Sequence, residues 1–121
     1  MNFQKIAAIS AAIAIGLGAF GAHALNDRLV AAGTLEAWKT AVLYHLVHSV
    51  ALYFLAVRPS GLQNRSSLLA ARLWSVGILL FSGSLYGLAL GGPPLLGPIT
   101  PLGGLSLIAA WVALAFAKTS E

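Results

Sequence analysis

The chain has 121 residues, 59% of them hydrophobic and 8% charged, and seven bases against three acids give a net charge of +4. An average soluble domain has about 25% charged residues, so this composition excludes an ordinary soluble protein and indicates one membrane-embedded domain, residues 1–121. The bases stand singly between apolar runs, which argues against nucleic-acid binding, and the absence of cysteine excludes disulfides and thiolate metal sites.

The first apolar run, residues 6–25, would be about 30 Å long as a helix, which matches the hydrocarbon core of a bilayer. A cleaved signal peptide is the alternative interpretation, because Lys5 precedes the run and residues 22–24 fit an A-x-A cleavage site. Three further apolar runs follow, and they favour a transmembrane helix that packs against later helices.

The next segment, residues 26–38, predicts a short interfacial helix on the outer side, and Gly33 can end it. Thr34 is expected to cap the second long helix, whose apolar stretch covers residues 40–57. Residues 58–72 contain three arginines and no acid, and we expect a loop there.

The third apolar run is residues 73–90 and the fourth is residues 101–117. Residues 91–100 separate them and contain three prolines and no charge. We expect this segment to be a loop at the membrane surface, or one folded back between helices where protein shields its backbone. Thr100 and Pro101 predict the start of the fourth helix, a hydroxyl cap followed by proline at the first position.

The distribution of bases predicts the orientation of this compact four-helix bundle. If the N-terminus lies in the cytoplasm, that side holds five bases and the outer side two. This agrees with the positive-inside rule, so we expect both termini in the cytoplasm. The inner bases are Lys5, Arg58, Arg65, Arg72 and Lys118, and the outer ones are Arg28 and Lys39.

Small residues at four-residue spacing predict where the helices approach one another, because lipid tails leave little hydrophobic gain from burial between helices. We expect packing within one bundle, and a homo-oligomer is the alternative. The stripes are Ser10, Ala14, Gly18 and Ala22 in the first helix, Gly83, Gly87 and Gly91 in the third, and Ala109, Ala113 and Ala117 in the fourth.

Ionisable side chains inside a membrane are costly and indicate a functional site by default. Antiparallel neighbours should bring histidines and hydroxyls into one polar cluster in the outer half of the bundle. Its candidate members are His23, Tyr44, His45, His48, Ser82, Ser84 and Tyr86.

Two interpretations of this cluster are open. Histidines that hydrogen-bond across helices would make the protein a non-enzymatic scaffold or interaction protein in the bilayer. Alternatively, His23, His45 and His48 could bind a transition metal, haem or a lipid-like ligand, or serve a transporter as a proton relay. No cofactor is predicted by any motif.

Catalytic motifs are absent from the sequence: there is no nucleophile elbow, phosphate-binding glycine loop or carboxylate pair, so we expect no enzyme. A proton-coupled drug exporter would need a carboxylate inside the membrane. The three acids, Asp27, Glu36 and Glu121, all lie outside the apolar runs, which argues against that class.

Four blocks of the sequence resemble the YgdD-like family, in the same order along nearly the whole chain. The blocks are GAFGAH (18–23), WKTAVLYHLVHSVAL (38–52), FSGSLYGLAL (81–90) and GPITPLGG (97–104). The resemblance implies a small multi-pass protein of the bacterial inner membrane, with distant eukaryotic relatives. It implies no activity, substrate or cofactor, because the function of that family is unknown.

Overall fold

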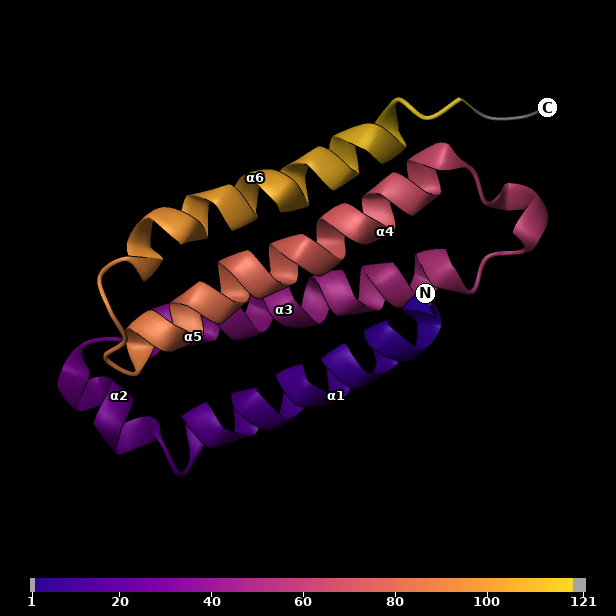
Figure 1. Ribbon diagram of the computed structural model, residues 1–121. Coiled ribbons are helices and arrows are strands. Elements are labelled where there is room, and N and C mark those ends of the chain that lie inside the picture. Colours follow the sequence, from indigo (N-terminus) through magenta and orange to yellow (C-terminus); the bar gives the residue numbers. More distant parts are fainter. Residues whose placement is uncertain (1, 119–121) are drawn as a thin grey trace.

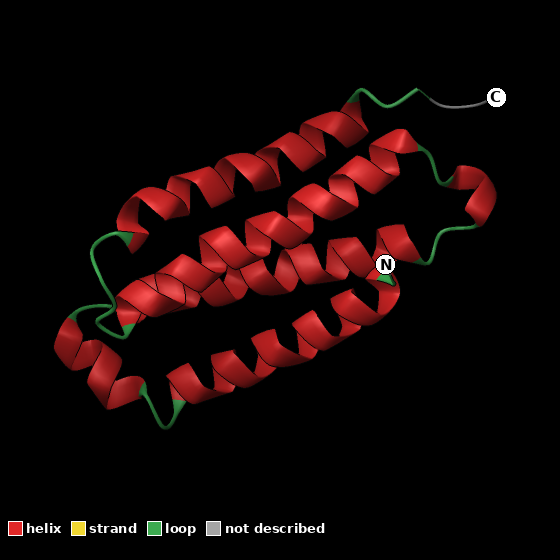
Figure 2. Ribbon diagram, viewed as in Figure 1, coloured by secondary structure: helices red, strands yellow, loops and turns green. Residues whose placement is uncertain are grey.

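The computed structural model describes residues 2–118, and within that range every regular element is a helix (Figure 1, Figure 2). Four helical segments are apolar and long enough to cross a membrane, which confirms the predicted all-α fold with four transmembrane helices. Each begins earlier in the sequence than the corresponding apolar run. They are α1 (Phe3–Ala22), α3 (Leu35–Ala56), the third span Arg65–Ala89 and α6 (Leu96–Ala115).

A short helix, α2 (Asn26–Ala32), follows α1 and lies at one end of the bundle (Figure 1). It ends at Gly33, whose φ of 72° is left-handed and therefore favours glycine. The predicted short helix is confirmed, and its place at the membrane surface stays a prediction. Thr34 is the N-cap residue of α3, as predicted, but its side chain makes no capping bond, because its hydroxyl donates to the carbonyl oxygen of Ala89 at 2.9 Å.

The third span consists of three consecutive segments without a break. A π-helical turn separates two α-helices, and such turns shift the face that each half presents to its neighbours. The segments are α4 (Arg65–Gly77), the π turn η2 (Ile78–Ser82) and α5 (Gly83–Ala89).

The connection from α3 to α4 is shorter than the predicted loop of residues 58–72. It contains a 3₁₀ turn, η1 (Ser60–Leu62), and α4 begins at Arg65. The reason is a cap that the sequence analysis missed: Asn64 Oδ1 accepts a hydrogen bond from the backbone N–H of Ser67 at 2.9 Å.

The start of α6 also differs from the prediction. The helix begins at Leu96, so Pro101 lies inside it and the predicted Thr100–Pro101 cap is wrong. Pro98 is tolerated because the first N–H groups of a helix have no intrahelical acceptor, and Pro101 removes only one bond. The Thr100 hydroxyl instead shares a hydrogen bond with the Ser84 hydroxyl of α5, at 2.5 Å.

The four spans pack as neighbours in the order α1, α3, third span, α6 (Figure 1). The first residues of α1 and the last of α6 lie at the same end of the bundle, opposite α2. A cluster of buried apolar side chains fills the space between α3, α4 and α6. Its largest members are Leu52, Leu55, Trp74 and Leu107.

Of the predicted glycine stripe in the third helix, only Gly87 lies against another span. Gly91 lies beyond the end of α5, and no described atom lies within 4 Å of a Cβ built on Gly83. Gly87 contacts only the side chain of Leu96, at 2.6 Å from such a Cβ. The face toward α6 also carries Gly77, where a Cβ would lie 2.5 Å from the side chain of Leu107.

The other two stripes fit the structure in part. In α1, Ala14 is fully buried and a Cβ on Gly18 would lie 3.2 Å from Val42 of α3, whereas Ala22 is exposed. In α6 the buried face is offset from the predicted alanines and consists of Gly103, Leu107 and Ala110. Four-residue spacing alone does not say which face meets a neighbour.

Candidate functional site

The buried imidazole of His45, in the middle of α3, uses both ring nitrogens for hydrogen bonds to other helices. Its Nδ1 lies 2.9 Å from the Tyr86 hydroxyl of α5. Its Nε2 lies 3.0 Å from the Ser10 hydroxyl of α1. One side chain therefore joins three helices.

The hydroxyls around His45 determine where its proton lies. Ser49 donates its only hydroxyl hydrogen to the carbonyl oxygen of His45, at 2.7 Å. Ser10, whose oxygen is 2.6 Å from that of Ser49, must then be the donor between the two serines. Ser10 therefore accepts from Nε2–H. Because a charged side chain inside the membrane is costly, His45 is expected to be a neutral imidazole, and Nδ1 then accepts from the Tyr86 hydroxyl.

His48 makes the corresponding connection to α6. The indole N–H of Trp111 donates to His48 Nε2 at 3.0 Å, so the ring proton is on Nδ1 and donates to the carbonyl oxygen of Tyr44 at 2.8 Å. The ring of Trp74 packs edge-on against both Trp111 and His48, with centroids 4.6 and 6.2 Å away. His48 is therefore neutral as well, with the opposite tautomer.

The structure brings together only part of the predicted polar cluster. Tyr44 stacks on His48 with ring centroids 6.0 Å apart. Ser82 donates to the carbonyl oxygen of Ala41 at 2.8 Å, and Ser84 bonds toward α6. His23 is exposed at the end of α1. The set thus divides into separate contacts and does not form one cluster.

Sequence reasoning missed two members of these networks. Ser49 is one turn from His45, and this spacing could have indicated the bond to its carbonyl. Trp111 gave no signal, because a tryptophan in an apolar run is expected to face lipid or core. Ser10 was predicted only as a small packing residue, yet its hydroxyl bonds to α3.

Metal binding by these histidines would require breaking the bonds just described, because all four ring nitrogens of His45 and His48 are engaged. Among residues 2–118, no group of three or more histidine, aspartate or glutamate side chains is placed to hold a metal ion. The arrangement is suited to holding helices together.

An open groove of about 670 Å³ runs between α1 and the third span, and His45 and Leu52 of α3 also line it. Its walls are almost entirely apolar, and they include Ile9 and Ile13 of α1 and Leu79 of η2. Because Gly83 has no side chain, it leaves free space on the wall opposite α1. The hydrogen-bonded group of Ser10, His45 and Tyr86 is the main polar part of the lining.

These features define an all-helical membrane protein with neutral, hydrogen-bonded intramembrane histidines. A family model described as a protein of unknown function (DUF423) matches residues 17–104. The chain belongs to this family, which includes the UPF0382 membrane proteins. The finer YgdD-like assignment stays a prediction.

Curated relatives cover almost the whole chain. It is 43% identical over 118 residues to the membrane protein YwdK of Bacillus subtilis, covering 95% of this chain and 94% of YwdK. It is 35% identical over 119 residues to the membrane protein C1782.12c of Schizosaccharomyces pombe, covering 94% and 98%. A Haemophilus influenzae membrane protein is 38% identical over 116 residues, covering 95% and 91%. The family thus occurs in bacteria and yeast, and no activity is named for these relatives.

No solved structure matches the chain.

Proposed function

We propose that this protein is a non-enzymatic protein of the bacterial inner membrane that binds a lipid-like molecule in the groove between α1 and the third span. The groove itself carries the proposal: it offers about 670 Å³ with nearly apolar walls. It follows α1 from Ile6 to Leu17, which is about 16 Å at 1.5 Å per residue. That length is about half of a hydrocarbon core, the depth of one leaflet.

The polar part of the groove favours a ligand with a long apolar chain and at most one or two hydrogen-bonding groups. Tyr86 donates its hydroxyl hydrogen to His45, but its oxygen keeps acceptor capacity. A hydroxyl on the ligand could donate to this oxygen without disturbing the bond to His45. Sites of this kind, apolar with few polar groups, are typical of small-molecule binding.

A metal or haem function is not part of the proposal, because both imidazoles would have to give up bonds between helices. Catalysis is not proposed either: the bonds from Tyr86 through Ser49 end on the carbonyl oxygen of His45, not on a titratable group. This closed series of hydrogen bonds supports a structural role for the histidines. Ligand binding is therefore assigned to the groove.

Photolabelling with a diazirine-bearing fatty acid tests the proposal on protein reconstituted in lipid nanodiscs. We expect labels on the groove walls, within residues 6–17 and 75–86. Gly83→Leu fills the groove, since a Cβ there meets no described atom within 4 Å. It should lower labelling roughly tenfold, as for a loss of about 1.4 kcal/mol of contact.

Ala109→Leu is the matched control, because it adds similar bulk to an exposed position of α6, which does not line the groove. Labels spread over all lipid-facing helices, or equal labelling of Gly83→Leu and Ala109→Leu, would contradict the proposal.

A scaffold function is the second candidate, and the small residues Ser75 and Gly83 on one groove wall favour it, since they permit a helix to approach closely. In that case the occupant is a helix of another membrane protein or of a second copy. Gly83→Leu would then lower the dimer fraction measured by light scattering in detergent and leave fatty-acid labelling unchanged.

A further inference from the structure

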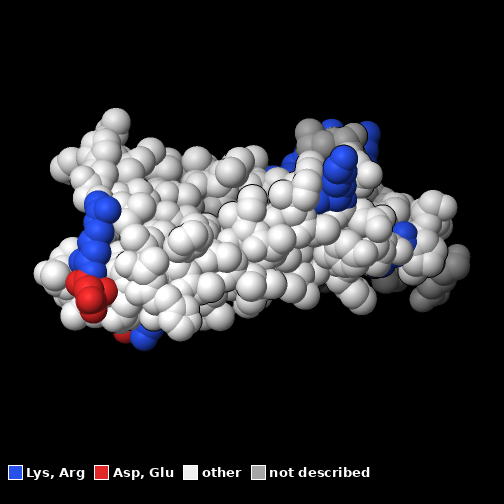
Figure 3. Space-filling model, turned by 90° about the horizontal axis from the view of Figure 1, so that it is seen from below, with Lys and Arg blue, Asp and Glu red and all other residues white. Residues whose placement is uncertain are grey.

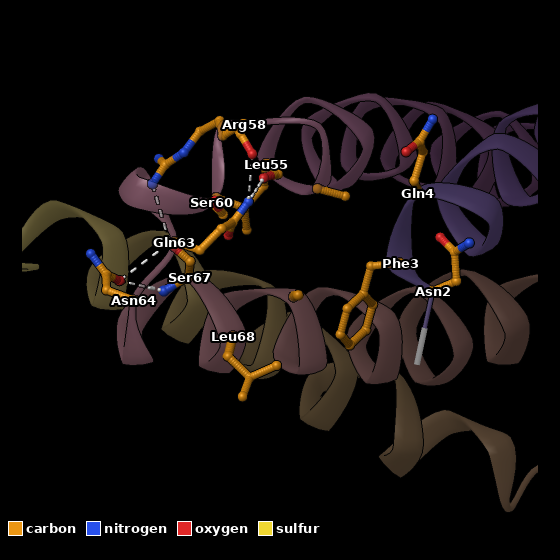
Figure 4. Close-up of a pocket in the computed structure, with 12 residues that line it drawn as sticks. Asn2, Phe3, Gln4, Leu55, Arg58, Ser60, Gln63, Asn64, Ser67 and Leu68 are labelled. Atoms are coloured by element: carbon orange, nitrogen blue, oxygen red, sulfur yellow. Dashed lines mark hydrogen bonds between the residues drawn. The ribbon is translucent and has the colours of Figure 1, made fainter.

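A second hollow, separate from the groove, lies where the start of α1 meets the connection between α3 and α4 (Figure 4). Its volume is about 590 Å³, and its lining residues differ from those of the groove. Arg58 and Gln63 lie on one side of the view, and Asn2 and Gln4 on the other. Its lining therefore includes one guanidinium and several amide groups, from two segments of the chain.

Hydrogen bonds to neighbouring residues hold Arg58 in place at this hollow, but they do not use all of its N–H groups. Its Nη2 donates to the carbonyl oxygen of Leu62 and to the hydroxyl of Ser67, the latter at 3.2 Å. Its Nε is buried and has no acceptor among the described residues. An anion in the hollow cannot reach this inaccessible Nε and would bind the terminal N–H groups instead, because both bonds that Arg58 makes to described residues come from Nη2 and leave the Nη1 donors for a ligand.

The charge at this end of the molecule is of one sign. Lys5, Arg65, Arg72 and Lys118 belong to the same end as Arg58, whereas both acids of residues 2–118 belong to the opposite end, in α2 and the first turn of α3. In Figure 3 the acids on the visible face gather at one end of the elongated molecule and the other end carries only bases. An anion in the hollow is thus attracted by several bases and repelled by no described carboxylate at that end.

The apolar part of the lining indicates which class of anion the hollow would bind. Phe3, Leu55 and Leu68 line the hollow beside its polar groups. A free phosphate ion would gain nothing from them, but a phospholipid presents a phosphate at the membrane surface and an acyl chain just below it. Basic pockets between transmembrane helices bind anionic headgroups in this way.

We propose that this hollow is a binding site for the phosphate of an anionic phospholipid, with Arg58 as the principal donor. The site lies at the end that the sequence assigns to the cytoplasmic leaflet. It does not depend on the groove, and either site can exist without the other.

Native mass spectrometry of the protein in neutral detergent tests the site. Phosphatidylglycerol and phosphatidylcholine with identical chains are the two probes, and wild type should retain the former in preference. Arg58→Gln should lower that preference roughly tenfold, because it removes the base that lines the site. Arg65→Gln is the matched control: it makes the same charge change at the same end, outside the lining, and should change the preference by no more than about twofold.

A second variant keeps the bonds of Arg58 to Leu62 and Ser67. Gln4→Glu adds a negative charge to the opposite wall, in the first turn of α1, where an acid is favourable for the helix. It should weaken phosphatidylglycerol retention as strongly as Arg58→Gln does.

Three results would overturn the proposal. Equal retention of the two lipids would show that no anionic headgroup is selected. Equal effects of Arg58→Gln and Arg65→Gln would show diffuse surface attraction. Full displacement of phosphatidylglycerol by millimolar inorganic phosphate, with no displacement by chloride at equal ionic strength, would make this a site for free phosphate.

Discussion

At the scale of single residues, two histidines of α3 bind the other spans. His45 reaches α1 and α5, and His48 reaches α6, each as a neutral ring with both nitrogens engaged. A hydrogen bond between membrane helices contributes about 0.6 kcal/mol on average and up to about 1.7 kcal/mol. The bonds between helices thus account for the positions of the two rings.

His45→Phe should lower the free energy of unfolding by about 1–2 kcal/mol, since it removes two interhelical bonds and keeps a ring of similar size. Unfolding in mixed detergent micelles, followed by tryptophan fluorescence, measures the change. His23→Phe is the control, because His23 is exposed, and it should stay within about 0.5 kcal/mol of wild type. Equal losses in the two variants would contradict a structural role for His45.

At the scale of elements, α6 approaches the π turn η2 closely at Gly103. A Cβ on Gly103 would overlap the backbone nitrogen of Phe81 and lie 2.6 Å from the carbonyl carbon of Leu80. Backbone atoms cannot rotate away as side chains do, so only glycine permits this contact. About one turn further on, α6 is also bonded to α4, because the Ser106 hydroxyl donates to the carbonyl oxygen of Leu73 at 2.7 Å.

Gly103→Ala should force α6 away from η2 and lower the free energy of unfolding by about 1–3 kcal/mol, the usual range for overpacking. Gly104→Ala is the neighbouring control. Its Cβ would lie 3.5 Å from the Phe81 ring, an ordinary contact, and alanine is favoured over glycine in helices. The same unfolding assay should show no loss for Gly104→Ala; a loss equal to that of Gly103→Ala would refute the close-contact explanation.

At the scale of the whole molecule, the two ends of the bundle differ in charge. One end carries Asp27 and Glu36 together with two bases, and the other carries five bases. The difference predicts that the five-base end, with the start of α1 and the end of α6, faces the cytoplasm. The same end contains the proposed phospholipid site, so orientation decides which leaflet supplies the lipid.

Single cysteines can test this orientation, because the chain has none of its own. Ala31→Cys, exposed in α2, should react with a membrane-impermeant maleimide in spheroplasts. Ser60→Cys, exposed in η1, should react only after the membrane is permeabilised. The reverse pattern would invert the topology proposed from the charges.

Particular residues show which structural features could be predicted from the sequence and which could not. The end of α2 was predictable because Gly33 has a local cause, its left-handed φ. The start of α6 was not, because a hydroxyl followed by proline is compatible with either a cap or a helix interior when another helix supplies a partner for Thr100. Likewise, His45 and Tyr86 were both named as candidates from the sequence, but the bond between them depends on how α3 and α5 are rotated.

The sequence by itself determined that the protein is embedded in a membrane, how many spans it has and how the two ends differ in charge. These properties depend on composition and on the length of apolar runs. Tertiary structure decided which small residues touch, which histidine meets which hydroxyl, and where the groove and the basic hollow lie. Those features arise from the rotation of each helix about its axis. In a chain that is apolar on nearly every face, the sequence pattern does not specify that rotation, and packing between helices does.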